Sequence, residues 1–489
     1  MTASASPSAS APVAPAVAQA FNDADKCVVA IDHGMRVGVG DTERATIAAG
    51  GTDAILAIVE TWTASNGMSG TRTVRAVFDA KFPTTKFDEA PGAYAGEESG
   101  SVGAAAFFGG KPHTITFGNG GNGGWADSSQ FLVAAAGAKT GTKLKATHSS
   151  KKVAAAGRDD LAVAVSVGIE TNGNDPNIIG KFEKSKAARA FTWDGKEAKS
   201  AVLMDDKDEP NAVAVAVGES RAAAVVRAGK KLWVVRIGND AARIGDPIEL
   251  AAGEVGSPTA IFNGDNLNVV WAQADAKGAA YQLRWASFDP SKGRVDLITP
   301  LDTKGASSFS PTLAMHKGHV LLAWMEGDAS KTGKVRLSRL DDGSKLDARA
   351  ETISHGTNAR DPRIAASDAG AWIVWSEFSA ATPKGDLRAS RIICAPDATS
   401  KPGLPDPVVV QQAAPEPKKC ETYLDCDGNE ECASGTCAAK CPKGQVILPI
   451  PGGGCGAACA ENPEFGKACP KGYSCMLTSN ISGGCVKDE

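Results

Sequence analysis

Three stretches of the chain share one pattern: SPTAIFNGDNLNVVWAQ at 257–273, SPTLAMHKGHVLLAWME at 310–326 and DPRIAASDAGAWIVWSE at 361–377. They align without gaps, and in each a proline is followed thirteen residues later by a tryptophan. The prolines Pro258, Pro311 and Pro362 are 53 and 51 residues apart. A spacing that recurs at a regular period indicates an internal repeat of about 50 residues.

Each unit reads as four short strands. An apolar strand follows the proline, a glycine-containing turn comes next, and the second strand is almost continuously apolar, as at 320–324. The third strand alternates and the fourth is short. Strands that are apolar on both faces are typical of a sheet covered on both sides. Four strands in about 50 residues is the size of a β-propeller blade.

Weaker copies begin near residues 44, 102, 151 and 210, which gives seven blades in all. The first two are the least regular, so six blades remain an alternative. Tandem β-sandwiches need about 90–100 residues per repeat, and the observed period argues against them. We therefore expect an all-β propeller in which Trp271, Trp324 and Trp375 occupy equivalent positions, buried between adjacent blades.

The composition bounds the rest of the chain. Its 489 residues are 43% hydrophobic with a net charge of −4, so there is no basic footprint for nucleic acid. No window approaches 18 continuous apolar residues, so no transmembrane segment is expected. The predicted domains are an Ala/Ser/Pro leader at 1–26, the propeller at 27–397, a Pro-rich linker at 398–419 and a cysteine-rich module at 420–489.

Ten of the twelve cysteines lie in the last 70 residues. This density is typical of a disulfide scaffold. The tail has no C-x-x-C pair and no histidine, which disfavours zinc. Because disulfides persist in oxidising compartments, the protein is expected to be secreted, periplasmic or attached to the cell surface.

The last repeat lacks a fourth strand, because a Pro-rich segment follows its third strand at 387–393. The stretch 27–31, Cys-Val-Val-Ala-Ile, is a candidate for the missing strand. Cys27 and Cys394 would then meet where other units have a hairpin. We expect them to form a disulfide that closes the ring.

These repeats resemble those of bacterial secreted β-propellers of the sialidase-like or BNR-like type, over 27–397 and most strongly over 210–394. The tail is similar to generic cysteine-rich modules of bacterial surface proteins. The resemblance implies the fold and leaves the activity open. An Asp box of the form S-x-D-x-G-x-T-W is missing, since the nearest text at 367–372 has different spacing. The stretch 361–364 resembles the family's arginine motif only loosely.

Four units begin with a proline at the point where inner strands converge on a central channel. The residues immediately before these prolines are candidate ligand-binding residues: Glu209, Ser257, Ser310 and Asp361. Arg363 is adjacent and is suited to an anionic ligand. The alternative for these positions is turn chemistry, since residues before proline favour extended geometry. A second candidate is Trp125, at the end of a glycine-rich run that begins at Gly118.

No metal or cofactor is predicted. His316 and His319 lie three residues apart, and Asp425-x-Asp427-x-Asn429 is similar to a calcium loop, but solvated turns explain both. The favoured function is a monomeric, non-catalytic binding or scaffold protein that presents a propeller face to a glycan or protein at the cell surface. Alternatives are a glycoside hydrolase or lyase acting at the channel, and a structural adhesin or matrix component.

Overall fold

The structure is a computed structural model, and it describes part of the chain. The described residues are 26–29, 35–39, 42–63, 69–78, 87–91, 100–119, 130–145, 148–170, 186–295, 297–303, 307–327, 333–340, 351–354, 358–367, 369–379, 382, 385–395, 430–433, 436–439, 445–447, 455–459, 473–477 and 483–487.

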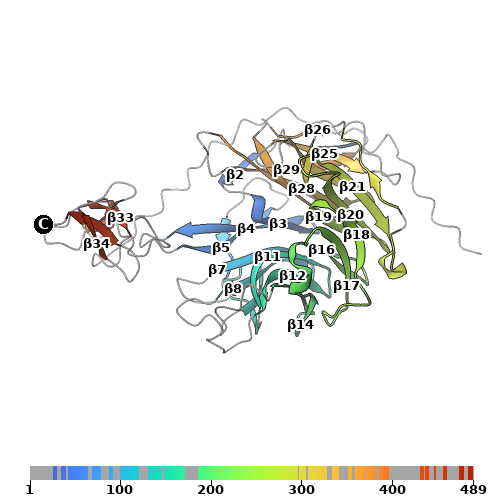
Figure 1. Ribbon diagram of the computed structural model, residues 1–489, viewed down its shortest axis with the longest axis horizontal. Helices are drawn as coiled ribbons and strands as arrows, with labels where there is room; N and C mark the ends of the chain where they lie inside the picture. The colour runs from blue at the N-terminus through green and yellow to red at the C-terminus, as the bar shows by residue number, and fades with distance from the viewer. Residues whose placement is uncertain are drawn as a thin grey trace, which may run out of the picture.

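The described part is all-β, and between residues 45 and 352 it consists of consecutive antiparallel units of four strands (Figure 1). The first two units are β3 (Ala45–Gly50), β4 (Asp53–Thr63), β5 (Ser69–Phe78), β6 (Phe87–Glu89), and β7 (Gly100–Phe108), β8 (Lys111–Asn119), β9 (Gln130–Ala135), β10 (Thr142–Lys145). The next two are β11 (His148–Gly157), β12 (Ala162–Glu170), β13 (Lys186–Trp193), β14 (Ala198–Met204), and β15 (Pro210–Val217), β16 (Ala222–Ala228), β17 (Lys231–Ile237), β18 (Ile248–Ala252).

The units with the Pro–Trp pattern follow. They are β19 (Glu254–Asn263), β20 (Asn266–Ala274), β21 (Gln282–Phe288), β22 (Thr299–Pro300), then β23 (Ser308–His316), β24 (His319–Gly327), β25 (Gly333–Leu340), β26 (Glu351–Thr352), and finally β27 (Ala359–Ser367), β28 (Gly370–Glu377), β29 (Asp386–Ala395). A single bridge between Gly333 and Ala359 joins the last two of these sheets.

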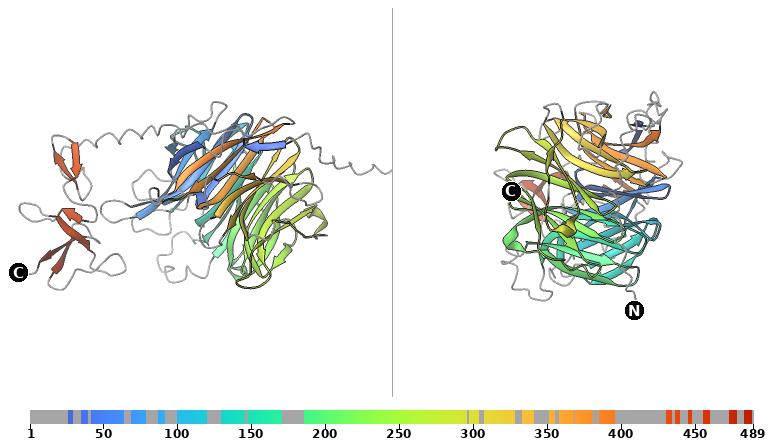
Figure 2. Two further views of the ribbon diagram at one scale, coloured as in Figure 1. Left: turned by 90° about the horizontal axis from the view of Figure 1, so that it is seen from above. Right: turned by 90° about the vertical axis from the view of Figure 1, so that its right-hand side faces the viewer.

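The inner strands meet in a closed circle. Contacts run from β3 to β7, β11, β15, β19, β23 and β27, and β27 contacts β3 again. The sheets are therefore arranged around a common centre, as Figures 1 and 2 also show. This is a β-propeller-like arrangement, in which residues far apart in the sequence face one channel.

The three tryptophans lie where the repeat predicted. Trp271, Trp324 and Trp375 are at most 1% exposed. Each belongs to a hydrophobic cluster that joins two successive sheets. The register pairs Pro258 with Trp271 across β19 and β20, and the other two tryptophans hold the same place in β24 and β28. The prediction of equivalent, buried positions is confirmed.

Two N-terminal strands complete the last sheet. Strands β1 (Lys26–Val29) and β2 (Met35–Val39) both pair antiparallel with β29. Cys27 lies opposite Cys394 in this register, and the two form a disulfide. An ion pair of 2.8 Å between Arg36 Nε and Asp386 Oδ1 adds a second link. The two ends of the repeat region are thus held together.

The cysteine-rich region contains short strands: β30 (Glu430–Ala433), β31 (Thr436–Ala439), β32 (Gln445–Ile447), β33 (Cys455–Cys459), β34 (Tyr473–Leu477) and β35 (Gly483–Lys487). The backbone register places Cys432 opposite Cys437, and Cys475 opposite Cys485. In the part of the chain that is described, no helix is long and apolar enough to span a membrane.

Candidate functional site

A cavity of about 990 Å³ lies where the inner strands begin. In each unit we count back from the residue that opens the first hairpin turn. These residues are Gly50, Phe108, Arg158, Gly218, Asn263, His316 and Ser367. The residue six positions earlier occupies what we call the rim position. The rim residues are Arg44, Val102, Lys152, Ala212, Ser257, Ser310 and Asp361, and all of them line the cavity. The expectation of one residue per unit around a channel thus describes how this site is built.

The alignment on proline is wrong for one unit. Counting back from the turn that follows Gly218 makes Val213, not Pro210, the equivalent of Pro258. Ala212 therefore takes the rim position, and Glu209 is an exposed residue that does not line the cavity. The physical reason is that the β-bulge of β15 lies between Pro210 and Ala212, so this proline stands earlier in its strand.

The residues before three prolines are not extended, which corrects the alternative explanation for them. Glu209, Ser310 and Asp361 have φ values of 50°, 45° and 48°. Bulges interrupt the register at these points in β15, β23 and β27. A left-handed backbone in residues other than glycine costs about 1–3 kcal/mol, so the surrounding structure must hold it in place.

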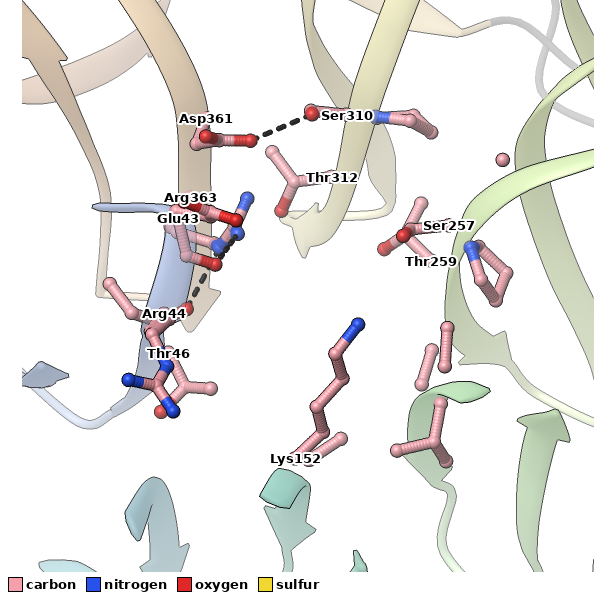
Figure 3. Close-up of a pocket in the computed structure, with 18 of the residues that line it drawn as sticks. Glu43, Arg44, Thr46, Lys152, Ser257, Thr259, Ser310, Thr312, Asp361 and Arg363 are labelled. Carbon is pink, nitrogen blue, oxygen red and sulfur yellow. Dashed lines mark hydrogen bonds between the residues drawn. The ribbon is translucent and has the colours of Figure 1, made fainter. Parts of the chain in front are cut away.

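Two of these strained residues bind each other. The Ser310 hydroxyl donates a hydrogen bond of 2.7 Å to Asp361 Oδ1, which joins the rims of two neighbouring sheets (Figure 3). Ser257 is exposed to the cavity on the next sheet. The structure therefore brings Ser257, Ser310 and Asp361 to one rim.

Arg363 also lines the cavity, but its N–H groups donate hydrogen bonds to backbone oxygens. Its Nε donates to Ala45 O at 2.8 Å and its Nη2 to Glu43 O at 3.0 Å, so it ties β27 to the first unit. A third bond runs from Nη1 to Pro362 O. These contacts make Arg363 a link between the last unit and the first.

Cations that local motifs did not reveal face the same space. Lys152 extends into the cavity, and Arg44 lines it from another unit (Figure 3). Arg227 of β16 is the third, held by bonds from its Nε to the Asn211 side chain and from its Nη1 to a backbone oxygen. Among the described residues, no carboxylate lies within ion-pair distance of Arg44 or Arg227.

The cations influence one another. Burial lowers the pKa of the Lys152 ammonium, Arg227 and Arg44 lower it further, and Glu43 acts in the opposite direction. Burial also lowers the pKa of the Arg227 guanidinium. The lowered pKa values of both groups mean that their positive charges are poorly solvated by the protein. Lys152 is nevertheless exposed to the solvent of the cavity. An incoming anion would relieve this cost.

Two carboxylates line the cavity as well. Arg360 Nη2 lies 3.9 Å from Glu43 Oε2, and Arg360 Nε lies 3.8 Å from Asp361 Oδ2. The guanidinium of Arg360 is itself stacked on Phe378, 4.6 Å from the ring centroid. Glu43 and Asp361 thus share one fixed arginine, and the charge balance of the lining is positive.

An aromatic pair completes the lining. The rings of Tyr281 and Phe309 lie 5.1 Å apart on neighbouring sheets, and both residues belong to the cavity wall. The backbone N–H of Tyr281 is bound to the Ser307 hydroxyl at 3.0 Å. Aromatic side chains next to charged groups suit a ligand whose ring has apolar faces and polar edges.

The other sequence candidates fall elsewhere. Trp125 and the stretch 425–429 lie outside the described residues. The explanation of His316 by a solvated turn is wrong, because its side chain is buried. It lies at the end of β23 away from the cavity, where its Nδ1 is 2.6 Å from Ser367 O. Among the described residues there is no group of three or more side chains suited to hold a metal ion.

No family model and no curated protein matches the sequence. Similar solved structures include the Trypanosoma rangeli sialidase in complex with 2,3-difluorosialic acid, at 11% identity and a TM-score of 0.38, covering 75% of this chain and 54% of that one. A protein of unknown function from Dyadobacter fermentans has 11% identity, a TM-score of 0.41 and coverages of 76% and 99%. The phage phi92 endosialidase has 7% identity, a TM-score of 0.44 and coverages of 78% and 71%. The chain spans about half the length of the trypanosomal sialidase.

Proposed function

We propose that the protein is a seven-bladed β-propeller, secreted or attached to the cell surface, that binds an acidic glycan in its central cavity without altering it chemically. The closed circle of inner strands supports the blade count. The Cys27–Cys394 disulfide and the cysteine-rich tail support an oxidising compartment. The tail at 420–489 is a separate module in this proposal, joined by the linker at 398–419.

One observation carries the choice of ligand. Arg44, Lys152 and Arg227 come from three different blades and converge on one cavity, in a chain whose net charge is −4. An excess of cations in one concave site favours an anion and raises its local concentration. Arginine is especially suited because its planar donors match a carboxylate or sulfate group.

The aromatic pair favours a sugar over a simple ion. A pyranose ring has apolar C–H faces that pack on aromatic rings, while its hydroxyls need polar partners. Tyr281 and Phe309 provide the first, and Ser257, Ser310 and Asp361 provide the second. The combination fits a saccharide that carries an acidic group.

The experiment is a glycan array probed with the purified protein and two lysine variants. We expect binding to carboxylated or sulfated glycans, no binding to neutral ones, and weakening by salt. Lys152→Met is expected to reduce binding at least tenfold. Lys230→Met removes the same charge from an 82% exposed side chain outside the cavity and is expected to change nothing. Equal binding of neutral glycans, or equal effects of the two variants, would overturn the proposal.

A second function has one observation in its favour. Glu43 and Asp361 both approach Arg360 in the cavity, and a pair of carboxylates is what glycoside hydrolysis uses. Turnover of any glycoside by the wild-type protein, abolished in Glu43→Gln and Asp361→Asn, would replace the binding function with a catalytic one. Arg360→Met is the control, because it removes the shared cation and leaves both carboxylates in place.

A further inference from the structure

The cavity changes character along its axis. Three residues before each first hairpin turn lies the floor position, and every unit places an aliphatic residue there. These residues are Ile47, Ala105, Ala155, Val215, Ala260, Leu313 and Ile364, and all except Ala105 line the cavity. Six of the seven units therefore give the cavity an aliphatic side chain at this level, beneath the rim.

The residues that line the cavity extend no further along the inner strands than the floor position. The next residue along each inner strand, such as Ala156 or Ile261, does not belong to the lining. Ile47, Ala155 and Ala260 are only partly buried, so the floor keeps apolar surface in contact with the cavity. The floor residues also pack against the hydrophobic clusters between sheets, which holds the ring in place.

Between rim and floor, three threonines accept backbone hydrogen bonds, and Arg363 donates to backbone oxygens. Thr46 accepts a hydrogen bond of 2.7 Å from Ala105 N, Thr259 one of 3.2 Å from Leu313 N, and Thr312 one of 3.3 Å from Ile364 N. Each threonine thereby links its own inner strand to the next. Water at the floor therefore meets mainly aliphatic groups, and its displacement by an apolar ligand group is favourable.

We infer that the floor is an apolar subsite for an alkyl or acyl chain, so that the ligand is an amphipathic acidic glycoside. This inference rests on the proposed function, because the acidic head would occupy the rim beside Arg44, Lys152 and Arg227. The chain would extend from the head toward Ile47, Ala155 and Ala260. Each methylene buried there contributes about 0.8 kcal/mol, which is roughly a fourfold gain in affinity.

Calorimetric titration with two probes tests the inference: methyl β-D-glucuronide and octyl β-D-glucuronide, the latter below its micelle concentration. We expect the octyl compound to bind at least tenfold more tightly. Ala155→Leu fills part of the floor and should reduce this gain to less than threefold, with the methyl compound unaffected. Ala156→Leu, one residue further along β11 and outside the lining, is the control and should retain the full gain.

If Ala155→Leu fails to fold, Ala260→Ser serves instead, because it adds a hydroxyl to the floor with little volume. It is expected to reduce the gain by at least half. Equal affinity for the two probes, with binding that still needs Lys152, would overturn the apolar subsite and leave the acidic-glycan function in place. Failure of both probes to bind, alongside acidic hits on the array, would also overturn it. Failure of every acidic glycan would overturn both proposals.

Discussion

The units β3–β18 and the units β19–β29 reach the same architecture with different side chains. In the second group a tryptophan fills the position opposite the proline: Trp271, Trp324 or Trp375. In the first group the equivalent residues are Ile58, Thr116, Ser166 and Val226, all buried. The register of the sheets therefore does not depend on the tryptophan.

The two groups also divide the work at the cavity. Arg44, Lys152 and Arg227 belong to the units without the pattern, while Ser257, Ser310 and Asp361 belong to the units with it. Arg360 and Arg363 also belong to the second group, where carboxylates and backbone oxygens hold them. The units β19–β29, which we call the regular half, are easy to recognise because one large residue recurs in their core. The units β3–β18, which we call the irregular half, carry the cations that we assign to ligand binding. The clearest sequence signal and the functional signal therefore lie in different places.

The disulfide ties the N-terminal strand β1 to β29 in the last sheet, and its loss is expected to have the largest effect. Cys27 and Cys394 are 367 residues apart in sequence, and a loop of this length constrains the unfolded chain by about 5 kcal/mol in the chain-entropy description. The double Cys27→Ser, Cys394→Ser variant should unfold at much lower urea concentration. An unchanged urea midpoint would mean that β1 and β2 hold the ring without the covalent link.

The tryptophan position provides the next test. Trp375→Ala is expected to cost about 3–5 kcal/mol, because a large, fully buried side chain is lost and a cavity remains. The equivalent Ile58→Val should cost only about 0.5–1.5 kcal/mol. Urea unfolding followed by circular dichroism measures both. A loss below about 1 kcal/mol for Trp375→Ala would contradict the packing described for the regular half.

A buried arginine links two neighbouring sheets of the irregular half, as the tryptophans do in the regular half. Arg75 is 1% exposed and donates to Ala135 O, Ala138 O and Asp88, which links β5 to the next sheet. Arg75→Met should cost about 2–3 kcal/mol, because two partly buried carbonyls and the Asp88 carboxylate lose their donor. Arg72→Met, on the same strand and 46% exposed, should cost less than about 1 kcal/mol. Equal costs would show that Arg75 is no structural link.

The smallest expected effect concerns pH. His113 packs edge-on against the rings of Phe108 and Trp193, and burial lowers its pKa below the usual 6.5. Just below pH 6.5 the unfolded chain takes up a proton that the folded protein does not, so stability falls as pH falls through this window. His113→Phe should remove that dependence. A stability profile between pH 5 and 7 that is identical in both proteins would refute this.

The sequence predicted the repeat, the closing strand and the core tryptophans, because each leaves a local mark at a fixed spacing. It misplaced one unit because Pro210 is a conspicuous residue on the wrong side of a bulge. It did not reveal Lys152 or Arg44, since their proximity arises only when the ring closes. Counting six residues back from each hairpin turn, instead of aligning prolines, would have placed both at the rim.

In the proposed function, the cations of the units β3–β18 hold the anionic group of the ligand. Titration of methyl β-D-glucuronide into Arg227→Met and Arg221→Met tests it directly. Arg227 lines the cavity, whereas Arg221, on the turn that leads into the same strand, is paired with Asp265 and Asp289 away from it. A hydrogen bond to a charged group contributes about 1.5–3 kcal/mol, so Arg227→Met should weaken binding at least tenfold. Arg221→Met should leave affinity within about twofold. Equal affinity in the two variants, both folded, would contradict the assignment of the cavity as the ligand site.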